Sequence, residues 1–322
     1  MSPLRPIDLL IAGAQKAGTT SLTDYLAQHP AICAHERSEI SFFIDDEEHG
    51  RGWGASFDRF YGHCRPDAVL LAKSVAVLGS SALMARVYAH NPAIRIIVVL
   101  RNPVDRAVSA YRYAVRKGLE TIDTFDEAVE APLSRHGGDT VRVRNTSYLA
   151  QGAYLSHVRR LYELFGRDQV LIHLYEDLAS DPIGVCARTF VFAGVESGFL
   201  PEVGRRRNTS AAPRSRRLAR VLSSQHPLKR AVREALPSRF AIALRRTLDR
   251  LNRGSAPEAI SPETRARLAA YYARQNEQLG VLIGRDLSSW SAPASPQPPD
   301  DRSAGATLPR AASREGADDP SA

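Results

Sequence analysis

The chain has 322 residues, which is enough for one large α/β domain with a full hydrophobic core. Hydrophobic residues make up 43% and charged residues 24% of it, and this composition excludes wholesale disorder. No apolar run approaches the ~20 residues that a membrane span needs. The first residues also lack the pattern of a signal peptide. We therefore expect a cytoplasmic protein of enzyme size.

The three cysteines, Cys33, Cys64 and Cys186, are odd in number and do not follow the spacing of metal-ligand motifs. Cytoplasmic proteins rarely keep disulfides, because their compartment is reducing. The sequence therefore predicts neither a disulfide scaffold nor a zinc site.

The positive charge is concentrated in one segment. The chain carries 43 Lys and Arg against 35 Asp and Glu, a net charge of +8. Residues 205–253 hold 15 of the basic residues and two of the acidic ones, so the rest of the chain is net negative. Three interpretations stay open: a solvated basic face, binding of an acidic acceptor, or peripheral attachment to an anionic inner-membrane surface. Nucleic acid is the least favoured partner, because Phe240 is the lone aromatic residue in this segment and bases stack on aromatic side chains.

Strand and helix patterns alternate along the first two thirds of the chain, which favours an α/β fold with a central, mainly parallel sheet. The expected strands cover residues 7–12, 69–72, 94–100 and 169–174. The expected helices cover residues 20–28, 80–89, 103–117, 152–165 and 181–193, and the polar stretch 134–145 is expected to be a loop.

The C-terminal part is predicted to be helical. Apolar residues recur at helical spacing between the arginines of segment 205–253. Ser261 and Pro262 are suited to open a last helix, which would end near Gly280. Residues 291–322 contain six prolines and a single large aliphatic residue, so we expect a disordered tail after a domain of residues 1–290.

The most specific motif is GAQKAGTTS at residues 13–21, placed between a predicted strand and a predicted helix. Such a turn offers backbone N–H groups and the positive end of a helix dipole to an anion. Gly13 and Gly18 have the spacing of a Walker A loop, but Thr19 stands where the lysine would be and Lys16 lies inside the turn. This displacement argues against an ATP- or GTP-hydrolysing enzyme. The alternative is an ordinary strand-to-helix turn.

A second anion site is predicted after the buried strand 94–100. Arg101 leaves the carboxyl end of that strand, where ligands of open α/β sheets bind. Ser109 follows about two helical turns later, and a guanidinium with a hydroxyl suits a phosphate monoester. The alternative is that Arg101 only pairs with a helix acid such as Asp105.

Together, the two motifs resemble the sulfotransferase family that uses 3′-phosphoadenylyl sulfate (PAPS) as donor. The resemblance continues through SEISFF at 38–43, Lys73-Ser74 and LYEDL at 174–178, and it ends with residues 276–290. It covers roughly residues 7–290 and is greatest to the carbohydrate branch, which includes heparan sulfate and many bacterial enzymes. It implies a P-loop-like, three-layer α/β fold.

The resemblance also implies how the donor is bound. The 5′-phosphosulfate would lie against the first loop, at Lys16, Ala17, Gly18, Thr19, Thr20 and Ser21. The 3′-phosphate would be bound by Arg101 and Ser109. Relatives close a loop over the phosphates at the position of Arg205, Arg206 and Arg207, and we take Arg207 as the contact.

Three residues are expected to carry the chemistry. Lys16 would assist the leaving group, Glu39 matches the carboxylate that serves as base in heparan sulfate enzymes, and Lys73 matches a lysine beside the transferred group. The alternative for Glu39 is a surface acid, with Glu36 and His35 as reserve bases.

The acceptor side departs from the family pattern. Ala72 replaces the usual acid before the lysine, and Val75 and Val77 replace a proline and an aromatic residue. We therefore expect a reshaped acceptor pocket beside Lys73. Segment 134–148 is a candidate wall for an anionic acceptor, through His136, Arg142 and Arg144.

The resulting hypothesis is a transferase that moves a sulfuryl group from PAPS to a hydroxyl of a saccharide, glycolipid or secondary metabolite. No metal is expected, because the transferred group carries less charge than a phosphoryl group. The alternatives are a nucleotide-dependent phosphotransferase and a non-catalytic basic module that binds membranes or nucleic acid.

Overall fold

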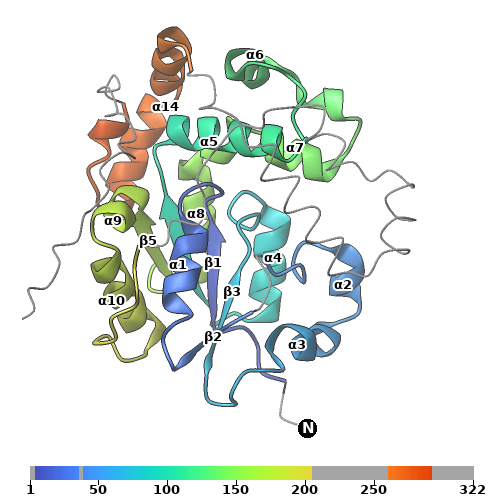
Figure 1. Ribbon diagram of the computed structural model, residues 1–322, viewed down its shortest axis with the longest axis vertical. Helices are drawn as coiled ribbons and strands as arrows, with labels where there is room; N and C mark the ends of the chain where they lie inside the picture. Colours follow the sequence, from blue (N-terminus) through green and yellow to red (C-terminus); the bar gives the residue numbers. More distant parts are fainter. Residues whose placement is uncertain (1–3, 36–38, 205–259, 292–322) are drawn as a thin grey trace, which may run out of the picture. The chain divides into compact units, whose positions relative to one another are not determined.

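Five parallel strands form the centre of the computed structural model, in the order β2-β3-β1-β4-β5 (Figure 1). The structure describes residues 4–35, 39–204 and 260–291. The predictions for segment 205–253, for the tail beyond Ser291 and for Glu36 lie outside these residues. The strands are β1 (Leu9–Gly13), β2 (Ile32–Ala34), β3 (Val69–Lys73), β4 (Arg95–Leu100) and β5 (Val170–Leu174).

Four of these strands were predicted, to within two residues at each end. β1 is buried along its whole length, and in β4 only Arg95 is exposed. Such continuous apolar runs are typical of strands covered on both faces. The short strand β2 was missed, because only Ile32 of its three residues is fully buried.

Helices cover both faces of the sheet. α1 (Thr19–Leu26) packs against α10 (Pro182–Ala193), while α4 (Ser81–His90) packs against α8 (Tyr154–Phe165). The chain runs from β1 through α1 toward one edge of the sheet, and from β3 through α4 toward the other. Right-handed crossovers therefore place α1 and α4 on opposite faces, which gives the expected three layers.

A second hydrophobic cluster lies around α5 (Pro103–Arg116), whose N-cap Asn102 accepts hydrogen bonds from the amides of Val104 and Asp105. The last helix, α14 (Pro262–Ile283), begins at Pro262 after the N-cap Ser261, as predicted, and contributes its buried Leu268 and Tyr272 to this cluster. The remaining short elements are α2 (Asp46–Gly50), α3 (Trp53–Tyr61), α6 (Phe125–Glu130), η1 (Leu133–His136), α7 (Thr140–Thr146), η2 (Ala150–Gly152), α9 (Tyr175–Ser180) and η3 (Ser288–Trp290).

The prediction of a loop over residues 134–145 was wrong. This stretch contains the end of η1 and most of α7. The side chain of Asp139 caps α7 by accepting a hydrogen bond from the amide of Arg142. The polar composition of the segment therefore marks a capped, partly exposed helix and not a loop.

The cysteine prediction also needs correction, because Cys33 and Cys64 form a disulfide. Cys33 lies in β2, and its Cα atom is 5.8 Å from that of Cys64, which precedes β3. The pairing of β2 with β3 brings the two residues together over a sequence separation of 31. Cys186 is free and buried. Among the described residues, no helix combines the length and the apolar character of a membrane span.

One tight contact tests how the second cluster is packed. A Cβ atom on Gly152 would lie 2.6 Å from the Tyr272 hydroxyl and 3.0 Å from Pro103 Cβ. We expect Gly152→Ala to lower the free energy of unfolding by about 1–3 kcal/mol, because α14 or α5 must shift. The matched control is Gly79→Ala, where nothing lies within 4 Å and where the change should stay within about 0.5 kcal/mol. Urea unfolding measures both, and equal effects would contradict the packing argument.

Candidate active site

The predicted site residues lie where the parallel strands end. The motif at residues 13–21, called the phosphate loop from here on, follows β1. Lys73 is the last residue of β3, and Arg101 follows β4. β2 leads into the segment that carries Glu39. The carboxyl ends of parallel strands meet at one edge of the sheet, and a crevice forms there where connections leave in opposite directions. Residues from four strands therefore converge on this edge.

The phosphate loop has the backbone that an anion site needs. Gly18 is the N-cap of α1 in a left-handed conformation, with φ of 85°, and Lys16 also has a positive φ of 72°. A Cβ atom on Gly18 would meet Leu178 at 3.0 Å and Tyr175 at 3.2 Å. The amide of Ala17 bonds to the Ala14 carbonyl within the turn. The amides of Thr19, Thr20 and Ser21 in the first turn of α1 have no partner within the helix, as at every helix start.

Lys16 spans two parts of the site. Its carbonyl accepts a hydrogen bond from Arg101 (3.2 Å), and its ammonium lies 4.9 Å from the centre of the Tyr113 ring on α5. Burial, together with the positive charges of Arg116, Arg101, Lys117 and Lys73, lowers the pKa of Lys16 to about 8. An anion bound here would relieve this repulsion.

Lys73 joins the phosphate loop to Glu39. Its ammonium is buried and lies 3.4 Å from Glu39 Oε1, and it donates a hydrogen bond to the Thr20 hydroxyl (3.1 Å). Glu39 Oε2 accepts a hydrogen bond from the Val75 amide (2.9 Å). Burial raises the pKa of Glu39, against the opposing effect of Lys73. Glu39 is therefore more than an isolated surface acid, which was the alternative.

The reserve base His35 has a structural contact. It is buried, and its Nε2 accepts the Lys73 amide proton (3.1 Å). Burial, followed by the charge of Lys73, lowers the pKa of His35 to about 4. The ring is therefore neutral and supports the backbone of the lysine.

Arg101 does not pair with Asp105, the alternative that the sequence left open. Asp105 binds Arg265 of α14 (2.9 Å) instead. The Arg101 guanidinium lies 4.5 Å from the centre of the Tyr175 ring. Ser109 lies on α5 and is partly exposed, but no hydrogen bond joins it to Arg101 within the described residues.

Comparison with known proteins shows the family of this chain. The family model of the sulfotransferase domain matches residues 6–209, which are more than half of the chain. The chain belongs to the sulfotransferase family. A solved sulfotransferase from Alicyclobacillus acidocaldarius has 28% sequence identity and a TM-score of 0.62, and the match covers 89% of this chain and 99% of that one. The predicted family and P-loop-like α/β fold are confirmed.

Two kinds of curated relative are similar to this sulfotransferase. Human heparan sulfate glucosamine 3-O-sulfotransferase 6 is 30% identical over 191 residues, which are 58% of this chain and 52% of the relative. Mouse bifunctional heparan sulfate N-deacetylase/N-sulfotransferase 1 is 30% identical over 197 residues, which are 59% and 22% of the two chains. The chain thus spans about half the length of the first relative and less of the second.

Glu176 and Asp177, at the start of α9, make structural contacts. Asp177 accepts a hydrogen bond from the Leu174 amide at the end of β5 and forms two hydrogen bonds with Arg285, each 2.9 Å long. Glu176 accepts a hydrogen bond from the Trp290 indole (3.2 Å). These contacts hold the C-terminal segment against the strand ends.

The segment proposed as an acceptor wall touches the phosphate loop. Asn145 of α7 accepts a hydrogen bond from Gln15 (2.9 Å). Arg144 lies near enough to lower the pKa of Glu39. In contrast, Arg142 binds the Leu119 carbonyl and His136 binds the Thr146 hydroxyl. Of the three wall residues named from the sequence, the structure brings Arg144 toward Glu39, the predicted base.

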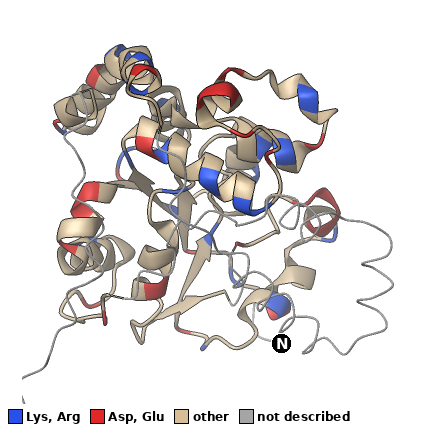
Figure 2. Ribbon diagram, turned by 45° about the horizontal axis from the view of Figure 1, so that its top comes forward, with Lys and Arg blue, Asp and Glu red and all other residues tan. Residues whose placement is uncertain are grey.

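The sequence did not single out Tyr113, Arg116 and Lys117, which surround Lys16. The side-chain cations of Arg116 and Lys117 lie 5.6 and 5.9 Å from the centre of the Tyr113 ring. In Figure 2, Lys and Arg segments appear on the helices that lie over the ends of the strands. One signal was available, since the chain has only four lysines and three of them, Lys16, Lys73 and Lys117, meet here. Arg205, Arg206 and Arg207 lie outside the described residues.

The lowered pKa of Lys16 predicts a pH effect on ligand binding. The ammonium loses its proton as the pH rises through about 8, so an anion then loses its partner. We expect the affinity for adenosine 3′,5′-bisphosphate to fall between about pH 7 and about pH 9. In Lys16→Arg the fall should disappear, because arginine stays protonated throughout this range. Calorimetric dissociation constants across the range measure both, and an unchanged profile in Lys16→Arg would exclude Lys16 as the titrating group.

Proposed function

We propose that this chain transfers a sulfuryl group from PAPS to a hydroxyl of an acceptor, within the site at the ends of β1, β3 and β4. The contact that carries this proposal is the bridge from Thr20 through Lys73 to Glu39. It places a carboxylate next to the phosphate loop, which is where an acceptor proton must be removed during transfer. The family to which the chain belongs supports the same chemistry.

The residues present fit a donor with phosphate groups at two positions. The first turn of α1 and Lys16 would hold the 5′-phosphosulfate, and Arg101 beside Ser109 would hold the 3′-phosphate. Tyr175 fixes the Arg101 guanidinium by stacking. PAPS supplies the transferable sulfuryl group together with a phosphate leaving group.

The chain's own residues would divide the remaining work. Glu39 accepts the proton of the acceptor hydroxyl, and its raised pKa makes it a stronger base than an exposed carboxylate. Lys16 stabilises the negative charge that develops on the departing phosphate oxygen. Lys73 holds Glu39 and Thr20 in place, so it fixes the distance between the base and the phosphate loop.

We further propose that no divalent metal takes part. Lys16, Lys73 and Arg101 already supply positive charge around the transferred group, and Glu39 is needed as a base. The transferred sulfuryl group also carries less negative charge than a phosphoryl group. Turnover in EDTA should therefore equal turnover in buffer with magnesium.

The acceptor is proposed to be a hydroxyl of a carbohydrate. The names of the curated relatives refer to heparan sulfate, a saccharide. Arg144 near Glu39, with Arg116 at the end of α5, would suit an acceptor that carries a negative group. A glycolipid or a hydroxylated secondary metabolite would present the same reacting group.

Calorimetric titration tests the donor class. We expect adenosine 3′,5′-bisphosphate to bind more tightly than ADP or Mg-ATP. Arg101→Ala should weaken binding of the bisphosphate by about 10–100-fold, which is the effect of losing one charged hydrogen bond. The affinity for adenosine 5′-monophosphate should stay almost unchanged. A preference for Mg-ATP would instead support the phosphotransferase, and binding of no nucleotide would support the basic module.

A second test addresses the base. Glu39→Gln removes the proton acceptor but keeps the shape of the side chain, so we expect kcat for sulfuryl transfer to fall by about 10²–10⁴-fold. Binding of adenosine 3′,5′-bisphosphate should stay within a few fold of the wild type. Glu47→Gln is the matched control, because Glu47 is exposed on α2. Full activity of Glu39→Gln would show that another group takes the proton.

A further inference from the structure

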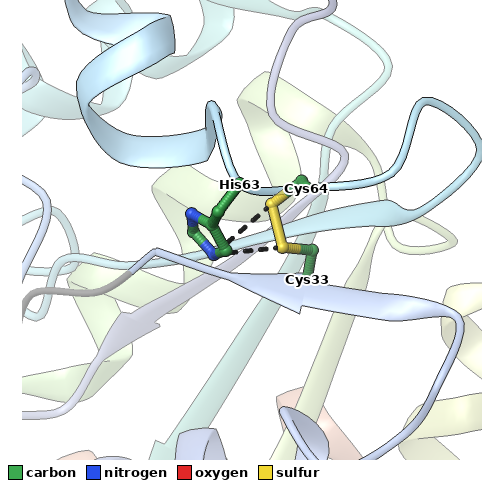
Figure 3. Close-up of side chains that lie close together, drawn as sticks. All are labelled: Cys33, His63 and Cys64. Atoms are coloured by element: carbon green, nitrogen blue, oxygen red, sulfur yellow. Dashed lines mark hydrogen bonds between the residues drawn. A yellow bond between two sulfur atoms is a disulfide. The ribbon is translucent and has the colours of Figure 1, made fainter.

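Two cysteines and a histidine that have no role in the proposed reaction form a cluster of sulfur and nitrogen atoms. Cys33 comes from β2, and His63 with Cys64 follows α3 (Figure 3). The two cysteines are joined by the disulfide, and the imidazole of His63 is directed at both sulfur atoms. Its Nε2 lies 3.4 Å from Cys33 Sγ and 3.7 Å from Cys64 Sγ. Among the described residues, this is the group whose ligand atoms could share a metal ion.

These distances match the edges of a metal-centred tetrahedron. With Zn–S bonds of about 2.3 Å and Zn–N bonds of about 2.0–2.1 Å, sulfur and nitrogen ligands of one zinc ion lie about 3.6 Å apart. The nitrogen of His63 is already at this distance from both sulfur atoms. Only the sulfur–sulfur separation must increase, and reduction of the disulfide produces that change.

We propose that the reduced form of this cluster binds a thiophilic divalent ion of the zinc class. The ligands are the thiolates of Cys33 and Cys64 and the Nε2 atom of His63, with water in the fourth position. A dithiol reductant supplies two electrons and two protons to the disulfide and itself becomes a disulfide. Zn²⁺ then displaces the two thiol protons, which go to the solvent. The disulfide form and the metal form exclude each other.

A metal ion bound at this cluster would link β2 to the connection before β3. Cys33 pairs with Leu70 in the register of β2 and β3, and it lies two residues before His35, which binds the Lys73 amide. The disulfide therefore ties the strand that leads to the site residues to the connection before β3. A reducing compartment opens such a bond. The metal ion then replaces the covalent cross-link at the same place.

The dithiol reductant and the zinc ion can both reach the cluster from the solvent. His63 is exposed, and Cys33 and Cys64 are partly exposed. The third cysteine does not compete for the ion, because it is buried and burial raises the pKa of the Cys186 thiol to about 12. A thiol with such a pKa does not form the thiolate that metals bind.

The experiment compares the reduced and oxidised full-length chain. After reduction with dithiothreitol and anaerobic gel filtration, Zn²⁺ is titrated in competition with a chromophoric chelator, and Co²⁺ serves as a spectroscopic probe. We expect one ion per reduced chain, with a thiolate-to-cobalt charge-transfer band, and no ion in the oxidised chain. Absence of zinc binding by the reduced chain, or equal binding by both forms, would overturn the proposal.

Three variants assign the ligands. The double variant Cys33→Ser, Cys64→Ser should lose the ion and the cobalt band. His63→Gln keeps both cysteines and should weaken zinc binding by at least about 100-fold, since loss of even an outer-shell partner costs 10–100-fold. Cys186→Ala is the matched control and should bind like the wild type, with circular dichroism confirming the fold of each variant. Unchanged affinity in His63→Gln, or retained affinity in the double serine variant, would overturn the three-ligand site.

Discussion

The site depends on one buried ammonium group, that of Lys73 at the end of β3. A buried charge is costly unless a partner of opposite charge and hydrogen bonds compensate it. Glu39 supplies the charge and Thr20 the hydroxyl. The backbone of the lysine is bound as well, since its amide donates to His35 and its carbonyl accepts from Ile40. The need to compensate one cation thus fixes the phosphate loop, β3 and the segment after β2 relative to one another.

The site also contains more positive than negative side chains, and this excess of positive charge would favour the proposed reaction. Positive groups on Lys73, Arg101, Arg116 and Lys117 all lower the pKa of Lys16, whereas Glu39 is the acid paired within this group. An anion with several charges relieves this repulsion more than a neutral ligand does. The excess of cations therefore favours the doubly phosphorylated donor, and the charge of Lys73 opposes the rise that burial causes in the pKa of Glu39.

The features that could be predicted from the sequence are those that a short stretch of residues determines by itself. β1 and β4 are continuous apolar runs, and the displaced Lys16 is visible within a nine-residue motif. β2 was missed because a strand of three residues is defined by its pairing with β3 and not by its own pattern. The disulfide was missed for the same reason, since the proximity of Cys33 and Cys64 depends on that strand. Periodicity placed Tyr113 on a helix but could not show that it faces Lys16.

In the proposed reaction, helix α5 connects the region that binds the donor to the region that binds the acceptor. A helix of 14 residues is about 20 Å long, with Arg101 just before its start and Arg116 at its end. Lys16 connects the two regions, because Arg101 binds its carbonyl while its side chain extends to Tyr113, three residues before the end of the helix. Lys16 makes both contacts from a left-handed backbone conformation. A lysine after Gly18, as in a Walker A loop, would start from the first turn of α1 instead. The displaced lysine is therefore suited to a leaving group that lies between the phosphate loop and the acceptor side.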